Sequence, residues 1–321
     1  MLLQCSKMSS TFMDNLIGSY KDADIVRYIT DSPRLSSCSS VSLLSANLVS
    51  KECQPGLIED TLQAMEVARQ LGIRVPSVKR VVYFEGMVYL IMERVDGVSL
   101  EKAWNKLGWI KSLRLALELR GYIRSLRSMI SSTAGSLKTG ECRSFWLDDL
   151  YRLPLRSSSA NLTSFLSFWV NLSNPRAAIK VTEDQLLATS LKNYIPSTAE
   201  PFVFTHHDLA PRNILLDKSG HLWLMDWDIA GWYPCFFEYA AMHNFIPEGW
   251  TRLARMRWNL LTWIAAGRWE RERRVLEQIR SKFTRFRAGR RFYLLKHRGI
   301  TRQLFLLLTP TSLVLTRHHG L

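Results

Sequence analysis

The sequence predicts an α+β fold in which a strand-rich first part precedes a larger, mainly helical part. Short apolar runs flank tight turns near residues 81–92 and again at 214–225, which is the pattern of β-hairpins. Longer stretches with apolar residues at helical spacing cover 110–130 and 250–278. A chain of 321 residues is long enough for two domains or one large one.

Composition excludes several classes of protein. The hydrophobic content of 47% and charged content of 22% are ordinary for a globular protein. No stretch of roughly eighteen apolar residues is present, so we expect no membrane span. The first ten residues lack the apolar run of a signal peptide. The five cysteines are scattered without a C-x-x-C pattern, so we predict a reduced, cytoplasmic protein without disulfides or a zinc site.

The net charge of +15 is concentrated in the last part of the chain. Residues 250–321 contain 17 Lys and Arg against 3 Glu, whereas residues 1–249 contain 26 basic and 25 acidic residues. A charge asymmetry of this size indicates an anionic partner or a solvated basic face. Residues 1–20 are polar and show no clear period, which predicts a mobile N-terminus.

A strand and a helix in the first part carry two candidate residues. Residues 47–51 predict a short strand that ends in Lys51, and residues 58–71 predict an amphipathic helix that contains Glu66. The apolar face of this helix consists of Leu62, Met65, Ala68 and Leu71. In kinase-like folds, a strand lysine paired with a helix glutamate directs an ammonium group at nucleotide phosphates. Taken alone, such residues are more often on the surface.

The middle of the chain predicts a hairpin and then a long helix. Residues 81–83 and 88–92 alternate around the turn Glu85-Gly86, as antiparallel strands do, and a polar link follows at 93–97. Residues 110–130 predict a core helix. Its apolar positions are Leu113, Leu117, Tyr122 and Leu126.

The densest polar pattern lies at residues 203–234, VFTHHDLAPRNILLDKSGHLWLMDWDIAGWYP. Asp208 precedes Asn213 by the five-residue spacing of the catalytic aspartate and metal-binding asparagine in the protein kinase template. Asp226 follows a hairpin that turns at Gly220. We predict that Asp208 orients and deprotonates an attacking hydroxyl and that Asn213 and Asp226 bind Mg²⁺. The alternative is that these side chains only hydrogen-bond to loop backbone.

These motifs resemble the aminoglycoside phosphotransferase / choline kinase-like family. HHDLAPRNILLD and LMDWDIAGWYP are similar to H-G-D-L-x-P-x-N-I-L and D-W-E-x-A-G-W-Y-P of uncharacterised fungal-type members. GIRVPSV, residues 72–78, is similar to the I-P-V-P-x-V stretch after the family's first helix. His207 replaces the usual glycine, and we expect its bulkier side chain to narrow the acceptor entrance. The resemblance covers about residues 45–245.

The resemblance implies a two-lobed protein-kinase-like fold with a small β-rich N-lobe and a larger, mainly helical C-lobe. The N-lobe would comprise residues 21–95 and the C-lobe residues 96–285, followed by a basic and apolar tail at 286–321. The phosphate-covering loop would fall within residues 21–50. No G-x-G-x-x-G is present there, and the Ser-rich stretch 32–40 is the candidate.

The resemblance also implies a nucleotide site. The link 93–97 would be the hinge between the lobes, whose backbone groups pair with the adenine edge. The predicted nucleotide-binding residues are therefore Glu93 and Val95 in the hinge, together with Lys51 and Glu66.

The prediction is thus an ATP- and Mg²⁺-dependent phosphotransferase that acts on a hydroxyl of a small molecule. Polycationic aminoglycosides need an acidic pocket, so the basic C-terminal segment favours a neutral or anionic acceptor. A nucleotide-binding pseudokinase is one alternative, favoured by the missing Gly-rich loop and by His207. A protein kinase is disfavoured because D-F-G and A-P-E are absent. A third alternative is a binder of nucleic acid or anionic lipid that works through the tail.

Overall fold

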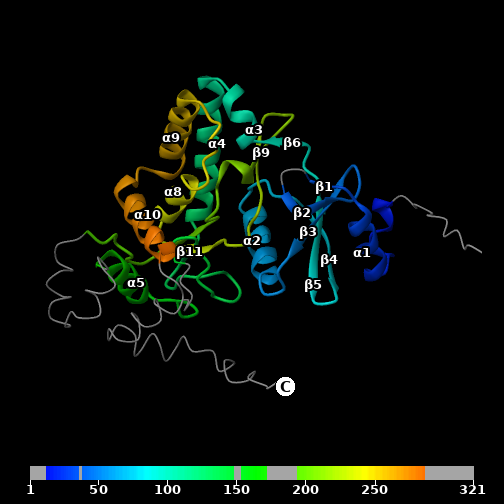
Figure 1. Ribbon diagram of the computed structural model, residues 1–321, viewed down its shortest axis with the longest axis horizontal. Helices are drawn as coiled ribbons and strands as arrows, with labels where there is room; N and C mark the ends of the chain where they lie inside the picture. Colours follow the sequence, from blue (N-terminus) through cyan, green and yellow to red (C-terminus); the bar gives the residue numbers. More distant parts are fainter. Residues whose placement is uncertain (1–11, 36–37, 148–152, 172–193, 286–321) are drawn as a thin grey trace, which may run out of the picture.

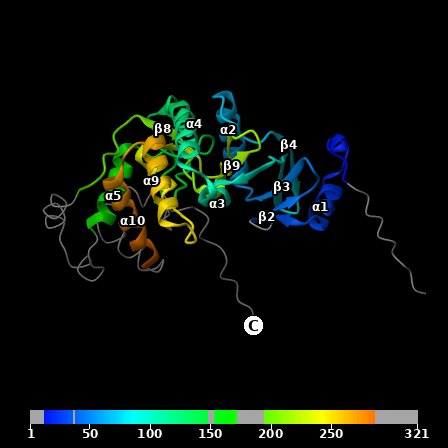
Figure 2. The same cartoon turned by 90° about the horizontal axis from the view of Figure 1, so that it is seen from above.

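The computed structural model describes residues 12–35, 38–147, 153–171 and 194–285, which form two lobes (Figures 1 and 2). An antiparallel sheet with the helices α1 (Asp22–Asp31) and α2 (Ile58–Gln70) makes up the N-lobe. Helices dominate the C-lobe. The predicted two-lobed α+β fold is therefore confirmed. The tail at 286–321 lies outside the described residues.

The N-lobe sheet has the strand order β1-β2-β3-β5-β4. Its strands are β1 (Arg34–Leu35), β2 (Cys38–Leu43), β3 (Leu48–Cys53), β4 (Val78–Phe84) and β5 (Met87–Glu93). The predicted hairpin turn between β4 and β5 has Glu85 and Gly86 at φ 47° and 77°, the left-handed conformation that suits a tight hairpin. The Ser-rich stretch proposed as a phosphate loop falls at the β1–β2 hairpin, whose tip at 36–37 lies outside the described residues.

The start of the described chain differs from the predicted mobile N-terminus. Phe12 is buried against Ile25 and Ile29 of α1, and a short 3₁₀ helix, η1 (Asp14–Leu16), follows it. Residues 12–20 therefore pack on the outer side of the sheet, because α1 supplies an apolar face that the sequence pattern of residues 21–50 did not reveal.

The C-lobe combines helices with two small antiparallel sheets, β10-β9-β6 and β11-β8-β7. Its helices are α3 (Leu100–Ala103), η2 (Trp104–Lys106), α4 (Trp109–Arg127), α5 (Ser159–Asn171), η3 (Pro211–Asn213), α8 (Phe236–Met242), α9 (Arg252–Ala266) and α10 (Glu270–Arg285). Its strands are β6 (Gly97–Ser99), β7 (Ile130–Ser131), β8 (Phe202–Thr205), β9 (Ile214–Asp217), β10 (Leu222–Leu224) and β11 (Gly231–Tyr233). Among the described residues, no helix is long and apolar enough to cross a membrane.

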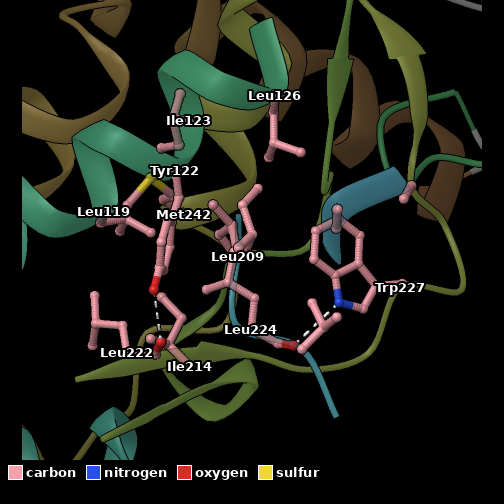
Figure 3. Packing of buried hydrophobic residues seen from close by; sticks show 14 of the residues in the cluster. Leu119, Tyr122, Ile123, Leu126, Leu209, Ile214, Leu222, Leu224, Trp227 and Met242 are labelled. Atoms are coloured by element: carbon pink, nitrogen blue, oxygen red, sulfur yellow. Dashed lines mark hydrogen bonds between the residues drawn. The ribbon is translucent and has the colours of Figure 1, made fainter. Parts of the chain in front are cut away.

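Helix α4 packs against the β9–β10 hairpin, which carries Ile214, Leu222 and Leu224 (Figure 3). Leu119, Ile123 and Leu126 of α4 are buried against the side chains of the β9–β10 hairpin. The Tyr122 hydroxyl donates to the carbonyl of Leu222 over 3.2 Å. Two of the predicted core positions of this helix are wrong. Leu113 and Leu117 are 41% and 62% exposed, because the face turned to α9 and the hairpin carries Leu115, Ala116 and Leu119 instead.

Candidate active site

Asp208 lies in the loop that leads from β8 through η3 to β9. Its Oδ2 accepts from Arg212 Nη2 over 2.7 Å and from Asn213 Nδ2 over 2.8 Å. Its Oδ1 is buried and has no hydrogen-bond partner among the described residues. Burial raises the pKa of Asp208 to about 7, although Arg212 and Asn213 act in the opposite direction. One oxygen is thus held in place and the other is left for an incoming donor.

Asn213 and Asp226 come from two turns that are bonded to each other. The backbone N–H of Met225 donates to the carbonyl of Asn213 over 2.8 Å, and a ring nitrogen of His206 lies 2.9 Å from the carbonyl of Met225. Asp226 has a φ of 66°, a left-handed conformation that Asp tolerates better than most residues. The predicted catalytic and metal-binding side chains therefore meet on one face of the C-lobe.

Lys51 reaches this face from strand β3 of the other lobe. Its ammonium lies 2.6 Å from Asp226 Oδ1 and 2.7 Å from Asp228 Oδ2. Burial lowers the pKa of Lys51, but the two carboxylates outweigh it, and the net shift is upward. Burial likewise acts against ionisation of Asp226, but Lys51 holds its pKa below the ordinary value. Lys51 is therefore charged and directed at the predicted metal site.

The predicted partner of Lys51 lies elsewhere. Glu66 is half-exposed and bonds Arg69 and Gln70 on its own helix, and the described residues contain no Lys51–Glu66 ion pair. The pairing is absent because α2 turns Asp60 and Thr61 to the interior. Thr61 Oγ1 donates to Asp228 Oδ1 over 3.1 Å, so α2 contacts the lysine through Asp228.

His207, which replaces the glycine expected from the motif, does not line an open entrance. Its side chain is fully buried, stacks on Tyr233 and Phe237, and has Nε2 2.6 Å from Ser144 Oγ. Burial lowers its pKa to about 3, so the ring is neutral. The expected narrowing of the acceptor site is therefore wrong, and one argument for a pseudokinase falls with it.

The buried carboxylate of Glu238 holds the turn that carries the two histidines. Its Oε2 accepts from the backbone N–H of His206 over 2.7 Å, and its Oε1 accepts from that of His207 over 3.1 Å. These two hydrogen bonds stabilise the backbone of His207 at a φ of 69°, a conformation that is uncommon for residues other than glycine. The sequence motif does not indicate this role of Glu238, because the residue lies thirty positions beyond Asp208, on α8.

Comparisons with known proteins identify the family of the chain. The model of the phosphotransferase enzyme family (APH) matches residues 46–276. The chain belongs to this family. Among solved structures, aminoglycoside phosphotransferase APH(4)-Ia is similar at 14% identity, covering 86% of this chain and 97% of that one, with a TM-score of 0.48. Aminoglycoside-3'-phosphotransferase of type VIII is similar at 18% identity, covering 78% and 91%, with a TM-score of 0.44. No curated protein sequence matches.

The link between the lobes of this phosphotransferase-family chain contains the two predicted hinge residues. Glu93 ends β5, and its backbone N–H donates to the Ser77 carbonyl over 2.9 Å while its carboxylate accepts from the Ser77 hydroxyl. Val95 lies between β5 and β6 and takes part in none of the backbone hydrogen bonds of the described residues. The backbone of Asp96, the next residue of the link, is likewise outside these hydrogen bonds, so both residues have N–H and C=O groups without a backbone partner among the described residues.

The donor set fits Mg²⁺. The described residues contain no group of three or more His, Cys, Asp or Glu side chains placed to hold a metal ion by themselves. Mg²⁺ does not require one, because it is commonly held by one or two protein oxygens together with phosphate oxygens of the substrate. Asn213 donates through Nδ2 and leaves its amide oxygen outside every hydrogen bond of the described residues, and Asp226 is partly accessible. These two oxygen donors would hold the ion.

Proposed function

We propose that the chain transfers the γ-phosphoryl group of ATP, with Mg²⁺, to a hydroxyl group of a small molecule. The observation that carries the proposal is the meeting of Asp208, Asn213 and Asp226 with Lys51, which comes from the opposite lobe. Family membership supports a phosphotransferase, and the unpaired backbone of Val95 supports a nucleotide between the lobes.

In the proposed reaction, the acceptor oxygen forms a bond to the γ-phosphorus as the bond to the β,γ-bridging oxygen breaks. ADP leaves with that electron pair, and the hydroxyl proton passes to Asp208. Asp208 Oδ1 is the free atom for this proton, because Oδ2 is held by Arg212 and Asn213. A carboxylate whose pKa is raised to about 7 by burial is well matched to proton transfer near neutral pH.

Lys51 would bind the nucleotide phosphates through its ammonium. Mg²⁺ bound at Asn213 and Asp226 would neutralise charge on the phosphate oxygens. We keep the cytoplasm as the proposed location, which the free thiols of Cys53, Cys142 and Cys235 support.

The test is ADP formation over a panel of hydroxyl-bearing metabolites with and without Mg²⁺. Asp208→Asn removes the base and is expected to reduce turnover by about 100-fold or more while nucleotide binding persists. Asp226→Ala is expected to abolish Mg²⁺-dependent turnover without loss of the fold, judged by circular dichroism. Near-native turnover in Asp226→Ala would show that the metal assignment is wrong. Nucleotide binding without ADP formation by the unmodified chain would instead identify a pseudokinase.

A further inference from the structure

Arg212 connects the proposed catalytic base to an aromatic ring. Its guanidinium donates to Asp208 Oδ2 over 2.7 Å and lies 4.5 Å from the ring centroid of Phe245. The Arg212 side chain is 36% exposed, so it is accessible beside the atom that would receive the acceptor's proton. An acceptor placed at Asp208 therefore meets a guanidinium and an aromatic ring.

A second guanidinium, that of Arg280, also contacts the Phe245 ring. Arg280 of α10 is within 5.3 Å of the Phe245 centroid, 5.6 Å of the Phe145 centroid and 5.5 Å of the Trp146 ring. Among the described residues, Arg280 has no acidic partner and bonds only the neutral amide oxygen of Asn244. Its positive charge therefore lies among aromatic rings and forms no ion pair within the described part of the chain.

A cavity of about 330 Å³ opens beside Arg280. Its walls are Trp146, His243, Asn244, Glu277, Arg280 and Ser281. Glu277 is the acidic group in this wall, but its carboxylate is engaged by Arg273. Burial lowers the pKa of His243, so its ring is neutral at neutral pH. Arg280 is thus the charge in the cavity wall that lacks a partner of opposite sign.

Phe245 is held in a strained and exposed position between the two arginines. Its φ is 55° and 46% of its surface is exposed. A residue other than glycine is uncommon in this left-handed conformation, and a bulky residue there is a backbone outlier. Strain of this kind persists at sites where the side chain has a role. Phe245 also makes an edge-on contact with Phe145, at 5.3 Å between centroids, and Arg280 lies over both rings.

We infer that this cavity binds the anionic end of the acceptor, and that the acceptor is a hydroxyl compound with an apolar or planar body and an anionic group. The body would lie on Phe145 and Phe245, the anion would bind Arg280, and the hydroxyl would face Asp208. Carboxylates and phosphate esters both match the fork of a guanidinium. The inference rests on the proposed function and adds the charge of the acceptor to it.

The experiment uses the full chain and four compounds that differ only in the group opposite one hydroxymethyl. They are para-(hydroxymethyl)benzoate, para-(hydroxymethyl)phenyl phosphate, the methyl ester of the benzoate, and para-(hydroxymethyl)benzylamine. Binding is measured by calorimetry, and ADP formation is measured separately. At least one of the two anions is expected to bind tenfold or more tightly than the ester and the amine, and the better anion identifies the class of acceptor.

Arg280→Gln is expected to remove this preference while binding of the methyl ester persists, which also reports that the variant is folded. Asn244→Ala is the second variant. It removes the amide oxygen that orients the Arg280 guanidinium, so the preference for anions is expected to decrease here too. Arg274→Gln is the matched control, because it removes one exposed charge from the same helix and should retain the preference.

The inference is overturned if neither anion binds, if the ester or the amine binds as well as the anions, or if the preference survives in Arg280→Gln. Preferential binding of an anion without ADP formation would instead contradict the proposed function and leave the anion site standing. ADP formation only with the amine would support phosphoryl transfer and overturn the anionic acceptor.

Discussion

Replacing Asp60 with alanine removes a buried carboxylate that ties helix α2 to the C-lobe. Asp60 is 2% exposed. Its Oδ1 accepts from the backbone N–H groups of Lys138 and Thr139 over 2.7 and 3.0 Å. Its Oδ2 accepts from the Thr139 hydroxyl and from Arg143 Nη1, each over 2.7 Å. Four donors from one segment of the C-lobe thus converge on a single side chain of the N-lobe.

The cost of the substitution follows from which donors lose their only acceptor. Arg143 keeps Glu141 at 2.5 Å and the Gly56 carbonyl at 2.9 Å, so it is not left as an unpaired buried charge. The two backbone N–H groups, of exposed Lys138 and half-buried Thr139, have no such replacement in the described residues. Each loses a hydrogen bond to a charged group, which costs about 1.5–3 kcal/mol. We therefore expect Asp60→Ala to lower the free energy of unfolding by about 3–5 kcal/mol.

Glu66 provides the matched control, since it lies on the same helix and was the residue that spacing singled out. Its carboxylate is half-exposed and pairs with Arg69 at i+3, an interaction worth about 0.3–0.5 kcal/mol. Glu66→Ala is therefore expected to leave the free energy of unfolding almost unchanged. The two variants compare the effect on stability of removing the buried carboxylate of α2 with that of removing an exposed one.

The assay is urea unfolding of the wild type and both variants at neutral pH and in acid. Burial would raise the pKa of Asp60, but the hydrogen bonds from Thr139, Lys138 and Arg143 hold it below the ordinary value. A depressed pKa stabilises the fold above the ordinary value, and this contribution is lost as the pH falls. The difference between wild type and Asp60→Ala should therefore narrow below about pH 4. Two results would refute the reasoning. One is an equal loss of unfolding free energy in Asp60→Ala and Glu66→Ala. The other is a difference between wild type and Asp60→Ala that grows in acid.

Two further predictions concern stability. Gly135→Ala is expected to lower the free energy of unfolding by more than about 3 kcal/mol, because Gly135 has a φ of 129° and an added Cβ would lie 2.2 Å from the Gly140 carbonyl oxygen. Gly121→Ala in α4 meets open space and should raise the free energy of unfolding by about 0.5–1 kcal/mol. A thermal melt that ranks the two variants in the opposite order contradicts both predictions. Burial raises the pKa of Glu238 from 4.5 to about 7. Protonated Glu238 therefore contributes up to about 3 kcal/mol to the free energy of unfolding at low pH, and this contribution is lost as the pH rises to 7. Glu238→Gln should flatten the fall in unfolding free energy between about pH 4.5 and pH 7, and an unchanged slope counts against this assignment.

Local sequence patterns predicted the structure correctly where it depends on residues close together in the chain. The helix expected at 58–71 is α2 at Ile58–Gln70, and the turn expected at Glu85-Gly86 joins β4 to β5. The meeting of Asp208 and Asn213 is also local, since five residues of one loop fix their separation. Hydrophobic period and turn chemistry act over such distances, which is why these features could be predicted.

The buried face of a helix was less predictable than its bounds. In α4, Leu117 is 62% exposed while Ala116 beside it is fully buried. Hydrophobicity alone ranks the leucine as the core residue. Burial is instead decided by the side on which α9 and the β9–β10 hairpin pack, and small residues permit that close approach. This information lies in parts of the chain far from α4.

The partner of Lys51 shows the same limit at the candidate site. A buried ammonium requires an opposite charge, so some acidic partner was certain on physical grounds. Which one depends on the rotation of α2, and that rotation is fixed by Asp60, whose four donors belong to the C-lobe. With Asp60 and Thr61 turned inward, Glu66 faces solvent, and Lys51 turns to Asp226 and Asp228. Because Thr61 and Lys51 both bond Asp228, helix and strand of the N-lobe are anchored to one C-lobe carboxylate, and the cleft geometry depends on contacts that cross between the lobes.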